Sequence, residues 1–317
     1  MQKRALIIGI SGQDGSLMAQ FLIKKNYLVC GISRKKNNSN CTNLKKLGIN
    51  KIVKVINIDV ENYKKIKSFF NLFNPDEVYQ FSSVSSVSRA KEKPIKTLKY
   101  IFNITYNLLQ ICKTNKKIKM YFSGTGQIFN NHVKNISEDS EKLPANIYSY
   151  SKYLSLNLVD RYRELYGLKV CTGITYNHES YLRSKEFVTM KIIKDALDVK
   201  NGKKKKVILN NIDSFCDWGW APEYIEIMWM MLQKKKIKDY IIATGRTYSV
   251  YDFVKIIFDY LKLSLKTNLK VLNKKKSFNK KFLISTKKIN RDFNWKAKIF
   301  MKDIAILMLK NQYEKNN

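Results

Sequence analysis

Two side chains in this sequence, Tyr148 and Lys152, have the types and the spacing needed for acid–base chemistry. On a helix, residues four apart lie on one face, with Cβ atoms about 5–6 Å apart. A neighbouring ammonium stabilises a phenolate, which lowers the pKa of the tyrosine and lets it take a proton from a hydroxyl as hydride leaves. Thr125, at the end of a predicted strand, can hydrogen-bond the same hydroxyl. Alone, the pair would be an ordinary helix-surface contact; together with the motifs below it predicts a redox site.

The N-terminal segment predicts a dinucleotide site. Residues 5–8 form an apolar, partly β-branched run that ends in a glycine-rich turn, and a helical periodicity follows. Glycines let backbone N–H groups approach a pyrophosphate, which the positive end of the following helix also attracts. The spacing is GxxGxxG, not GxGxxG, but its place after the first strand favours a cofactor site over a structural loop. The expected cofactor contacts are Gly9, Gly12, Gln13, Asp14 and Gly15.

The next two strands indicate which dinucleotide is bound. A strand over 28–32 is followed by Arg34 and Lys35, where an NAD-specific site would place a carboxylate for the ribose 2′-hydroxyl. Two cations there favour a 2′-phosphate, and hence NADP, with NAD as the alternative. A third strand over 52–58 would bring Asp59 to the adenine.

The remaining pattern predicts an α/β fold, a Rossmann-type doubly wound parallel sheet. Strands over 77–81 and 119–122, with helical stretches between them, continue the alternation. A chain of 317 residues with 44% hydrophobic residues is long enough for a nucleotide-binding domain and a smaller lobe. We expect no signal peptide, no membrane span and no metal site. The five cysteines lack CxxC spacing, which indicates reduced, mostly buried thiols in a cytoplasmic protein.

The net charge of +35 does not by itself indicate nucleic-acid binding. Only eight of the 60 basic residues are arginine, whereas base recognition and bidentate phosphate contacts favour arginine. Lysine dominance of this kind is typical of an AT-rich genome. The lysine runs 203–206, 234–236 and 274–276 fall in predicted loops. We therefore expect no specific nucleic-acid partner, and a positive field that favours an anionic substrate such as a nucleotide diphosphate.

Beyond these patterns, the sequence resembles the extended short-chain dehydrogenase/reductases and, within them, the GDP-mannose 4,6-dehydratase family. The resemblance runs almost end to end. Its most specific motifs lie at residues 9–16, 75–79, 162–167, 177–180, 187–192, 217–219, 229–233 and 242–250.

The resemblance implies a domain organisation and an activity. Residues 1–175 would form the NADP-binding Rossmann domain and 176–317 mainly a substrate-binding lobe, with segments at about 213–250 returning to the first domain. The implied substrate is a nucleotide diphosphate sugar, GDP-mannose or a relative, and the implied assembly is a homodimer or homotetramer. The implied reaction oxidises sugar C4, removes water across C5 and C6, and returns the hydride to C6.

The resemblance also assigns residues. Tyr148 and Lys152 match the catalytic base and its helper, and Thr125 matches the threonine of the active-site strand. Asn177 and Lys191 match positions that resemble sugar-nucleotide contacts, and their amide and ammonium groups are suitable donors to phosphate oxygens. Asn177 could instead serve only as a turn residue after a strand. The cofactor set becomes the glycine-turn residues with Arg34, Asp59, Ser82, Tyr148, Lys152 and Asn177; the substrate set is Asn177, Arg183, Val188 and Lys191.

Several positions depart from the family pattern. Gln127 stands where the family has the glutamate that removes the C5 proton, and an amide is not a base near neutral pH. Cys216 and Met190 replace arginines, and the serine-rich stretch 82–86 replaces one with Gln and His. Residues 275–278 align with an Arg-Pro-x-Glu segment that they do not reproduce.

These departures leave three readings open. The protein is a 4,6-dehydratase in which another acid, such as Glu138 or Asp139, replaces the glutamate. Alternatively, it is a nucleotide-sugar 4-dehydrogenase, 4-ketoreductase or epimerase that uses only C4 redox chemistry. Third, it is an inactive cofactor-binding paralogue, against which the retained redox trio argues.

Overall fold

The computed structural model describes residues 2–33, 41–83, 87–129, 133–273 and 281–313. Expectations for Arg34, Lys35, 84–86 and 275–278 lie outside the described residues. The chain forms two compact units. The first comprises residues 1–130, 140–175 and 225–242, and the second comprises 131–139, 176–224 and 243–317.

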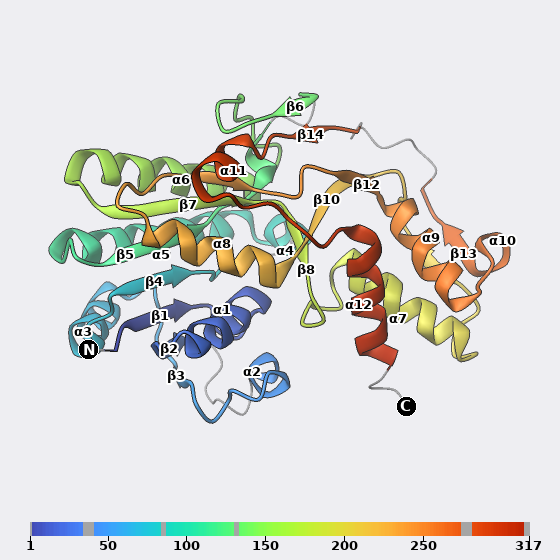
Figure 1. Ribbon diagram of the computed structural model, residues 1–317, viewed down its shortest axis with the longest axis horizontal. Helices are drawn as coiled ribbons and strands as arrows, with labels where there is room; N and C mark the ends of the chain where they lie inside the picture. Colours follow the sequence, from blue (N-terminus) through green and yellow to red (C-terminus); the bar gives the residue numbers. More distant parts are fainter. Residues whose placement is uncertain (1, 34–40, 84–86, 130–132, 274–280, 314–317) are drawn as a thin grey trace. The chain divides into compact units, whose positions relative to one another are not determined.

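A seven-stranded parallel sheet forms the centre of the first unit (Figure 1). Its order, β11-β7-β5-β4-β1-β2-β3, reverses direction between β1 and β4, as in a doubly wound Rossmann sheet. The predicted fold class is therefore confirmed. The strands are β1 (Arg4–Ile8), β2 (Leu28–Ile32), β3 (Lys54–Ile56), β4 (Glu77–Gln80), β5 (Lys119–Ser123), β7 (Lys169–Thr175) and β11 (Tyr240–Ile242).

The predicted third strand is too long. Val53 belongs to a turn, because its N–H donates to the carbonyl of Ile49, and only Lys54–Ile56 pairs with β2. The helices between the strands are α1 (Gln13–Lys24), α2 (Thr42–Lys46), α3 (Tyr63–Phe73), α4 (Val87–Glu92), α5 (Pro94–Thr114) and α6 (Ile147–Tyr166), and α8 (Ala221–Gln233) precedes β11.

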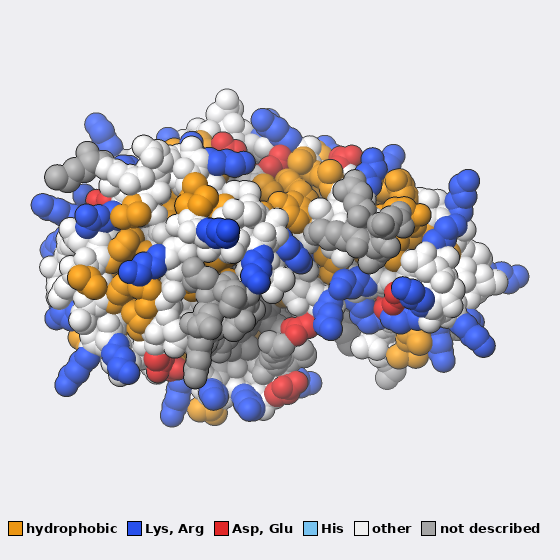
Figure 2. Space-filling model, turned by 90° about the horizontal axis from the view of Figure 1, so that it is seen from below, with side chains coloured by type: hydrophobic (Ala, Val, Ile, Leu, Met, Phe, Trp, Pro, Cys, Tyr) orange, Lys and Arg blue, Asp and Glu red, His pale blue; other side chains and the backbone are white. Residues whose placement is uncertain are grey.

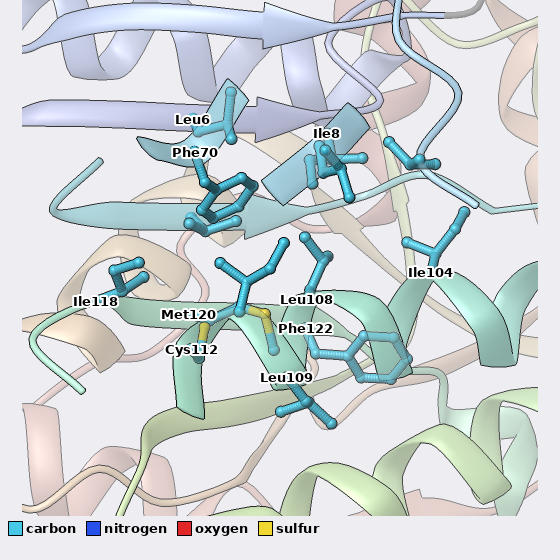
Figure 3. Packing of buried hydrophobic residues seen from close by; sticks show 14 of the residues in the cluster. Leu6, Ile8, Phe70, Ile104, Leu108, Leu109, Cys112, Ile118, Met120 and Phe122 are labelled. Atoms are coloured by element: carbon cyan, nitrogen blue, oxygen red, sulfur yellow. The ribbon is translucent and has the colours of Figure 1, made fainter. Parts of the chain in front are cut away.

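Apolar residues of the strands pack against α3, α5 and α6 on one face of this sheet (Figure 3). Met120 and Phe122 of β5, with Leu108 of α5 and Phe70 of α3, are almost fully buried there. Both faces of a parallel sheet are covered, so its strands are apolar on both sides. This packing fixes α6, which carries Tyr148 and Lys152, and β5, after which Thr125 follows.

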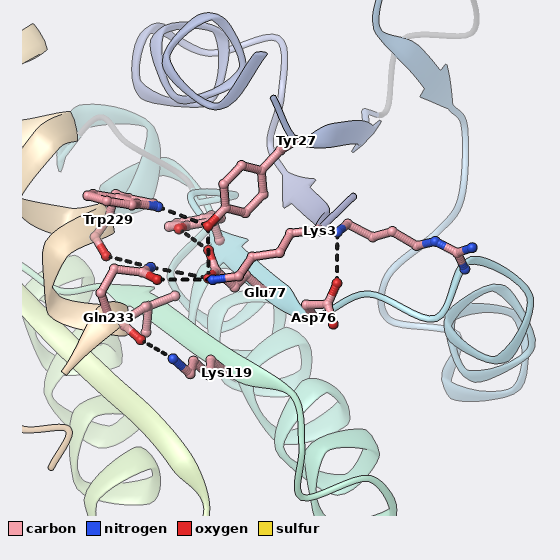
Figure 4. Close-up of polar contacts among 10 residues, drawn as sticks. Lys3, Tyr27, Asp76, Glu77, Lys119, Trp229 and Gln233 are labelled. Atoms are coloured by element: carbon pink, nitrogen blue, oxygen red, sulfur yellow. Dashed lines mark hydrogen bonds and ion pairs between the residues drawn. The ribbon is translucent and has the colours of Figure 1, made fainter. Parts of the chain in front are cut away.

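A buried carboxylate ties the segment 225–242 to the sheet (Figure 4). Glu77, at the start of β4, is 1% exposed and accepts hydrogen bonds from the hydroxyls of Tyr27 and Tyr79 and from Nε2 of Gln233 in α8. Trp229, one helical turn earlier in α8, donates through Nε1 to the hydroxyl of Tyr27. Three donors on one carboxylate compensate for its removal from water.

An ion pair between Arg163 and Asp239 holds the loop that follows α8. The Nη1 atom of Arg163, in α6, lies 2.8 Å from Oδ1 of Asp239, and Nη2 donates to Oδ2 at 2.9 Å. Asp239 also accepts from the N–H of Thr172 in β7. The bidentate geometry matches the planar guanidinium to the carboxylate and fixes the approach to β11.

The second unit combines small sheets with a helical core. Its strands form three sheets, β12-β10-β8, β13-β9 and β14-β6, and α7, α9 and α12 share an apolar cluster with β10. The elements are β6 (Asn135–Ile136), β8 (Asn177–Glu179), α7 (Val188–Lys200), β9 (Val207–Leu209), β10 (Phe215–Trp220), β12 (Thr247–Ser249), α9 (Val250–Leu261), α10 (Leu265–Asn268), β13 (Leu269–Val271), β14 (Leu283–Ile284), α11 (Lys287–Phe293) and α12 (Met301–Tyr313).

The segment that returns to the first unit is 225–242, narrower than the 213–250 expected from the sequence. Residues 213–224 and 243–250 belong to the second unit, where β10 pairs with both β8 and β12. The short segment 131–139 also belongs there, because β6 pairs with β14.

One face of the molecule shows how the basic side chains are distributed. On the face that Figure 2 shows, Lys and Arg side chains stand scattered among uncharged areas instead of filling one continuous patch. All five cysteines are free thiols, four of them buried. None of the helices in the described ranges is long and apolar enough to cross a membrane. Within those same ranges, no group of three or more His, Cys, Asp or Glu residues could hold a metal ion.

Replacing Glu77 by alanine should destabilise the protein by about 3 kcal/mol, because it removes the acceptor of the buried Tyr27 and Tyr79 hydroxyls and one acceptor of the half-buried Gln233 amide. Denaturant unfolding measures the change. The exposed Glu92 of α4 provides the control, and Glu92→Ala should change the unfolding free energy by no more than about 0.5 kcal/mol. Equal losses in both variants would contradict the role given to Glu77.

Candidate active site

Helix α6 begins at a well-defined cap that sets the positions of Tyr148 and Lys152. Asn146 accepts a hydrogen bond from the N–H of Ser149 through its side chain, and the Ser149 hydroxyl oxygen accepts from the N–H of Asn146. This reciprocal capping box satisfies two backbone donors at the start of the helix. Tyr148 then lies in the first turn, and Lys152 lies one turn later on the same face.

Lys152 is a buried lysine of the first unit. It is 2% exposed, and its Nζ donates to the backbone carbonyl of Ser123, at the end of β5, at 2.6 Å. Burial lowers the pKa of the ammonium from 10.5 to about 7, opposed by the negative charge of Asp14. Near neutral pH the charged and neutral forms of this amine are therefore close in free energy, which suits a group that assists proton transfer.

Tyr148 is half-buried, and its ring packs at the margin of the apolar cluster between α6 and the sheet. Its ring is thus held in place while the residue stays partly accessible. A phenol one helical turn from a buried amine can pass a proton to or from a ligand hydroxyl.

Thr125 and Gln127 follow β5 in a short 3-10 turn, η2 (Gly126–Ile128). Thr125 is buried and caps this turn, because its hydroxyl oxygen accepts from the N–H of Gln127 at 3.3 Å. Gln127 is exposed, and its Oε1 accepts from Nδ2 of Asn146 at 3.4 Å. The predicted redox trio and position 127 therefore gather between the carboxyl end of β5 and the start of α6.

The three glycines of the first turn have different physical requirements. Gly9 has φ +92° and, if it carried a Cβ, that atom would lie 2.7 Å from the amide nitrogen of Ser82. A Cβ on Gly15 would lie 2.4 Å from the carbonyl oxygen of Gly9. Gly12 is exposed, and among the described residues its Cβ would meet that same carbonyl alone, at 3.4 Å. The fold explains Gly9 and Gly15 by close packing but gives no such reason for Gly12.

The open space at Gly12 fits a dinucleotide pyrophosphate. Gly12 is the N-cap of the twelve-residue α1 and has no side chain to cover the first N–H groups of that helix. Gln13 and Asp14 form the first turn of α1, and Nε2 of Gln13 donates to Oδ1 of Asp14. A helix N-terminus with an uncovered backbone at the carboxyl edge of a parallel sheet is where such folds bind phosphate.

Two further predicted cofactor residues lie in the first unit. Ser82 follows β4 beside Gly9, and its hydroxyl shares a 2.8 Å hydrogen bond with that of Tyr100. Asp59 is exposed beyond β3 and accepts from the N–H of Glu61. These positions follow the carboxyl ends of β4 and β3, on the same edge as the glycine turn.

The predicted substrate residues lie in the second unit. Asn177 begins β8, and Val188 begins α7. Lys191 donates to Oδ2 of Asp195 at 2.8 Å and to the carbonyl of Ile208 at 2.6 Å. Lys191 is therefore engaged within α7 and β9.

Arg183, the remaining predicted substrate residue, is also engaged within the second unit. Its Nε lies 3.1 Å from the carboxylate of Glu179, and its guanidinium stacks 3.5 Å from the ring centre of Phe187. These contacts use Nε and one face of the guanidinium.

The positions that depart from the family pattern also have defined surroundings. Met190 is 1% exposed within the apolar cluster of α7, α9 and α12, so it acts there as a core residue. Cys216 is half-buried in β10, where burial raises the pKa of its thiol to about 12. Glu138 is half-buried and Asp139 is exposed; both belong to the second unit, whereas Gln127 belongs to the first.

Sequence reasoning missed one residue of this site, Asn146. It links the cap of α6 to position 127. An N-cap residue directly before a predicted helix is a recognisable signal, but the contact with Gln127 joins residues 19 apart and depends on the tertiary fold.

The sheet order defines a Rossmann-fold protein. The UDP-glucose 4-epimerase of Thermotoga maritima superposes with a TM-score of 0.86 at 18% identity, covering 99% of this chain and 100% of that one. The dTDP-glucose 4,6-dehydratase of Bacillus anthracis superposes with a TM-score of 0.85 at 18% identity, covering 99% and 97%. At this level of identity the likeness concerns the fold.

Sequence comparison defines the family. The family model for GDP-mannose 4,6 dehydratase matches residues 6–308. GDP-mannose 4,6 dehydratase 1 of Arabidopsis thaliana is 31% identical over 99% of this chain and 90% of its own length. The GDP-mannose 4,6-dehydratase of Vibrio cholerae serotype O1 is 34% identical over 80% of this chain and 70% of its own. The chain belongs to the GDP-mannose 4,6-dehydratase family.

The contrast between Gly12 and Gly15 leads to a paired prediction. Gly12→Ala should fold with an unchanged melting temperature but bind reduced NADP at least about tenfold more weakly, because the new methyl occupies the phosphate approach. Gly15→Ala should lower the melting temperature, since its methyl collides with backbone. Fluorescence titration and thermal unfolding measure both properties, and normal cofactor affinity in Gly12→Ala would refute the placement of the pyrophosphate.

The buried Lys152 should destabilise the folded protein at pH values below 10.5, the ordinary pKa of lysine. With a folded pKa of about 7 against 10.5, the unfolded state binds one more proton between these values, so wild-type stability rises with pH there. The stability advantage of Lys152→Met over wild type should therefore shrink by about 1.4 kcal/mol per pH unit between about pH 7.5 and about pH 9.5. Denaturant unfolding at both pH values tests this.

The exposed Lys116 is the control for that measurement. Lys116→Met should show no comparable trend relative to wild type. If the Lys152→Met difference were equally flat, the ammonium would not be destabilised by burial.

Proposed function

We propose that this protein binds NADP, with NAD as the less favoured alternative, and catalyses hydride transfer at C4 of a nucleotide diphosphate hexose. GDP-mannose or a close relative is the substrate that family membership favours. The observation that supports the chemistry best is the buried amine of Lys152, one helical turn from Tyr148 at the carboxyl end of β5.

The proposed reaction assigns one task to each residue of the trio. The glycine-turn residues would hold a nicotinamide cofactor, whose chemistry would be to accept a hydride from C4. Tyr148, as phenolate, takes the proton of the C4 hydroxyl, so that the C4–O bond becomes a carbonyl. Lys152 stabilises the phenolate, and the Thr125 hydroxyl donates to the same substrate oxygen.

The water-elimination step has no base at position 127. The Gln127 amide has no basic form near neutral pH, and assistance of this kind is typically worth about 10²–10⁴ in rate. Complete 4,6-dehydration of GDP-mannose or of a related nucleotide sugar is the first candidate, because family membership favours it; Glu138 or Asp139 would then have to act as the acid. A 4-dehydrogenase, 4-ketoreductase or epimerase that uses only C4 redox chemistry is the alternative, because it needs no base at position 127. An inactive paralogue is the third, and the retained trio speaks against it.

We infer the assembly and the cellular location from the resemblance and the composition. The enzyme works as a homodimer or homotetramer in the cytoplasm, where reduced thiols such as these persist. Fold relatives such as RMD of Pseudomonas aeruginosa, solved with NADPH, and the Bacillus anthracis dehydratase, solved with NAD, support a nicotinamide cofactor of either type.

Mass spectrometry of the products from GDP-mannose and NADP tests the proposal. A product lighter by two hydrogens, with NADPH formed, supports oxidation at C4 alone. A product lighter by one water means that elimination proceeds without the glutamate. Epimerisation at C4 leaves the mass unchanged, so sugars of unchanged mass are examined by NMR, and an inverted C4 supports an epimerase. Unchanged mass and unchanged stereochemistry with every one of a set of nucleotide sugars, despite bound cofactor, would favour the inactive paralogue.

Gln127→Glu should create or increase water elimination, because it supplies a carboxylate beside the C4-oxidised sugar. The measurement is the fraction of product lighter by one water, relative to wild type. Tyr148→Phe is the matched variant: it should abolish hydride transfer while leaving the affinity for NADPH nearly unchanged. C4 oxidation without any dehydrated product in Gln127→Glu would contradict the role of position 127, and full turnover in Tyr148→Phe would contradict that of the tyrosine.

A further inference from the structure

Two buried hydroxyls where α6 packs on the sheet have no hydrogen-bond partner among the described residues. They belong to Ser155, in α6, and Thr172, in β7, and both residues are 0% exposed. Their neighbours are different: the hydroxyl of Ser151 donates to the carbonyl of Ile147, and that of Thr175 donates to the carbonyl of Gly124. An unbonded hydroxyl in the interior is costly, so this pair requires an explanation.

The Thr172 side chain lies against the same end of β5 as the ammonium of Lys152. Thr172 is paired in register with Phe122 of β5, which places both side chains on one face of the sheet. A Cβ on Gly124 would lie 2.7 Å from Cγ2 of Thr172. Nζ of Lys152 lies 4.9 Å from the ring centre of Phe122 and donates to the carbonyl of Ser123. The sheet therefore presents the Thr172 hydroxyl near the buried amine.

Ser155 approaches the same place from the helix. It follows Lys152 by three residues, so both side chains lie on one face of α6, and both are buried. An ammonium has three N–H donors. Among the described residues, the carbonyl of Ser123 is the one oxygen that accepts from Nζ of Lys152. The amine and the two hydroxyls thus all have hydrogen-bonding capacity left.

We propose that Ser155 and Thr172 are positioning residues for Lys152, and that their hydroxyls hold one buried water that accepts a second hydrogen bond from the ammonium. The inference rests on the proposed catalytic role of Lys152. The water has three partners, the amine and both hydroxyls, and buried waters typically make about three hydrogen bonds. It favours the charged amine, fixes the side chain and leaves the third N–H for the redox site.

The titratable groups around Lys152 come from several elements. Asp14, in the first turn of α1, is the negative charge that favours the ammonium, against the larger effect of burial on its pKa. Tyr148 precedes Lys152 by one turn, and Tyr100 and Cys112 lie in α5, where burial raises the pKa of the Cys112 thiol. Two further pairs face elsewhere: Lys91 and Glu92 of α4 are exposed, and Tyr121 and Cys171 alternate with the residues that face α6.

The test is the pH dependence of stability, which needs neither cofactor nor substrate. Thr172→Val keeps the shape of the side chain without the hydroxyl. Loss of the water should lower the pKa of Lys152 from about 7 by about one unit, the worth of one hydrogen bond to a charged group. The charged amine then costs more in the folded state. The unfolding equilibrium constant relative to wild type should therefore be about fivefold higher at about pH 6 than at about pH 9, where the folded amine is neutral in both proteins.

Three further variants make the measurement specific. Thr172→Ser keeps the hydroxyl and should restore the wild-type pH dependence. Ser155→Ala should show the same trend as Thr172→Val, and the double variant should exceed neither, because one water is lost once. Thr105→Val is the control: its buried hydroxyl is already bonded to the carbonyl of Ile101, so it should show no trend with pH.

The outcomes separate this inference from the proposed function. A gain in stability in Thr172→Val that is independent of pH would mean that the hydroxyl is unbonded, and would overturn the water. Additive trends in the double variant would overturn the shared site. Either result leaves the C4 chemistry standing. The expected pH trend in a protein that transfers no hydride would keep the water and reject the catalytic role of Lys152.

Discussion

The burial of one ammonium group is the constraint on which the site depends. Lys152 sits under α6 against the carbonyl of Ser123, where water cannot solvate its charge. Such a group is costly, and it persists only because the packing of α5 and α6 on the sheet fixes the helix that carries it. The same cost brings its pKa to about 7, into the range where a proton can be exchanged.

The rest of the first unit holds that helix in register with β5. The capping box of Asn146 and Ser149 sets where α6 begins, and the pair of Arg163 and Asp239 fixes its later turns against β7 and the approach to β11. At the amino end of β4, Glu77 holds α8 by accepting a hydrogen bond from Gln233. Buried polar groups with fully matched partners of this kind specify one arrangement more strictly than apolar contact alone.

Position 127 shows that the local structure and the chemistry of one side chain are separate matters. The backbone turn, the threonine cap and the contact with Asn146 do not require a carboxylate at this position. An amide keeps the turn and supplies a donor but no base. The consequence is chemical, and the fold around it is the same.

The sequence by itself determined the α/β alternation, the glycine turn and the Tyr148–Lys152 spacing, because these depend on local periodicity and on neighbours one helical turn apart. It also determined family membership. Only the tertiary structure decided that Gly12, unlike Gly9 and Gly15, is not required by packing, and that segment 131–139 joins the second unit. The burial of Lys152 and the link from Asn146 to Gln127 also came from the structure, because desolvation and contacts between residues distant in the chain exist only once the elements have packed.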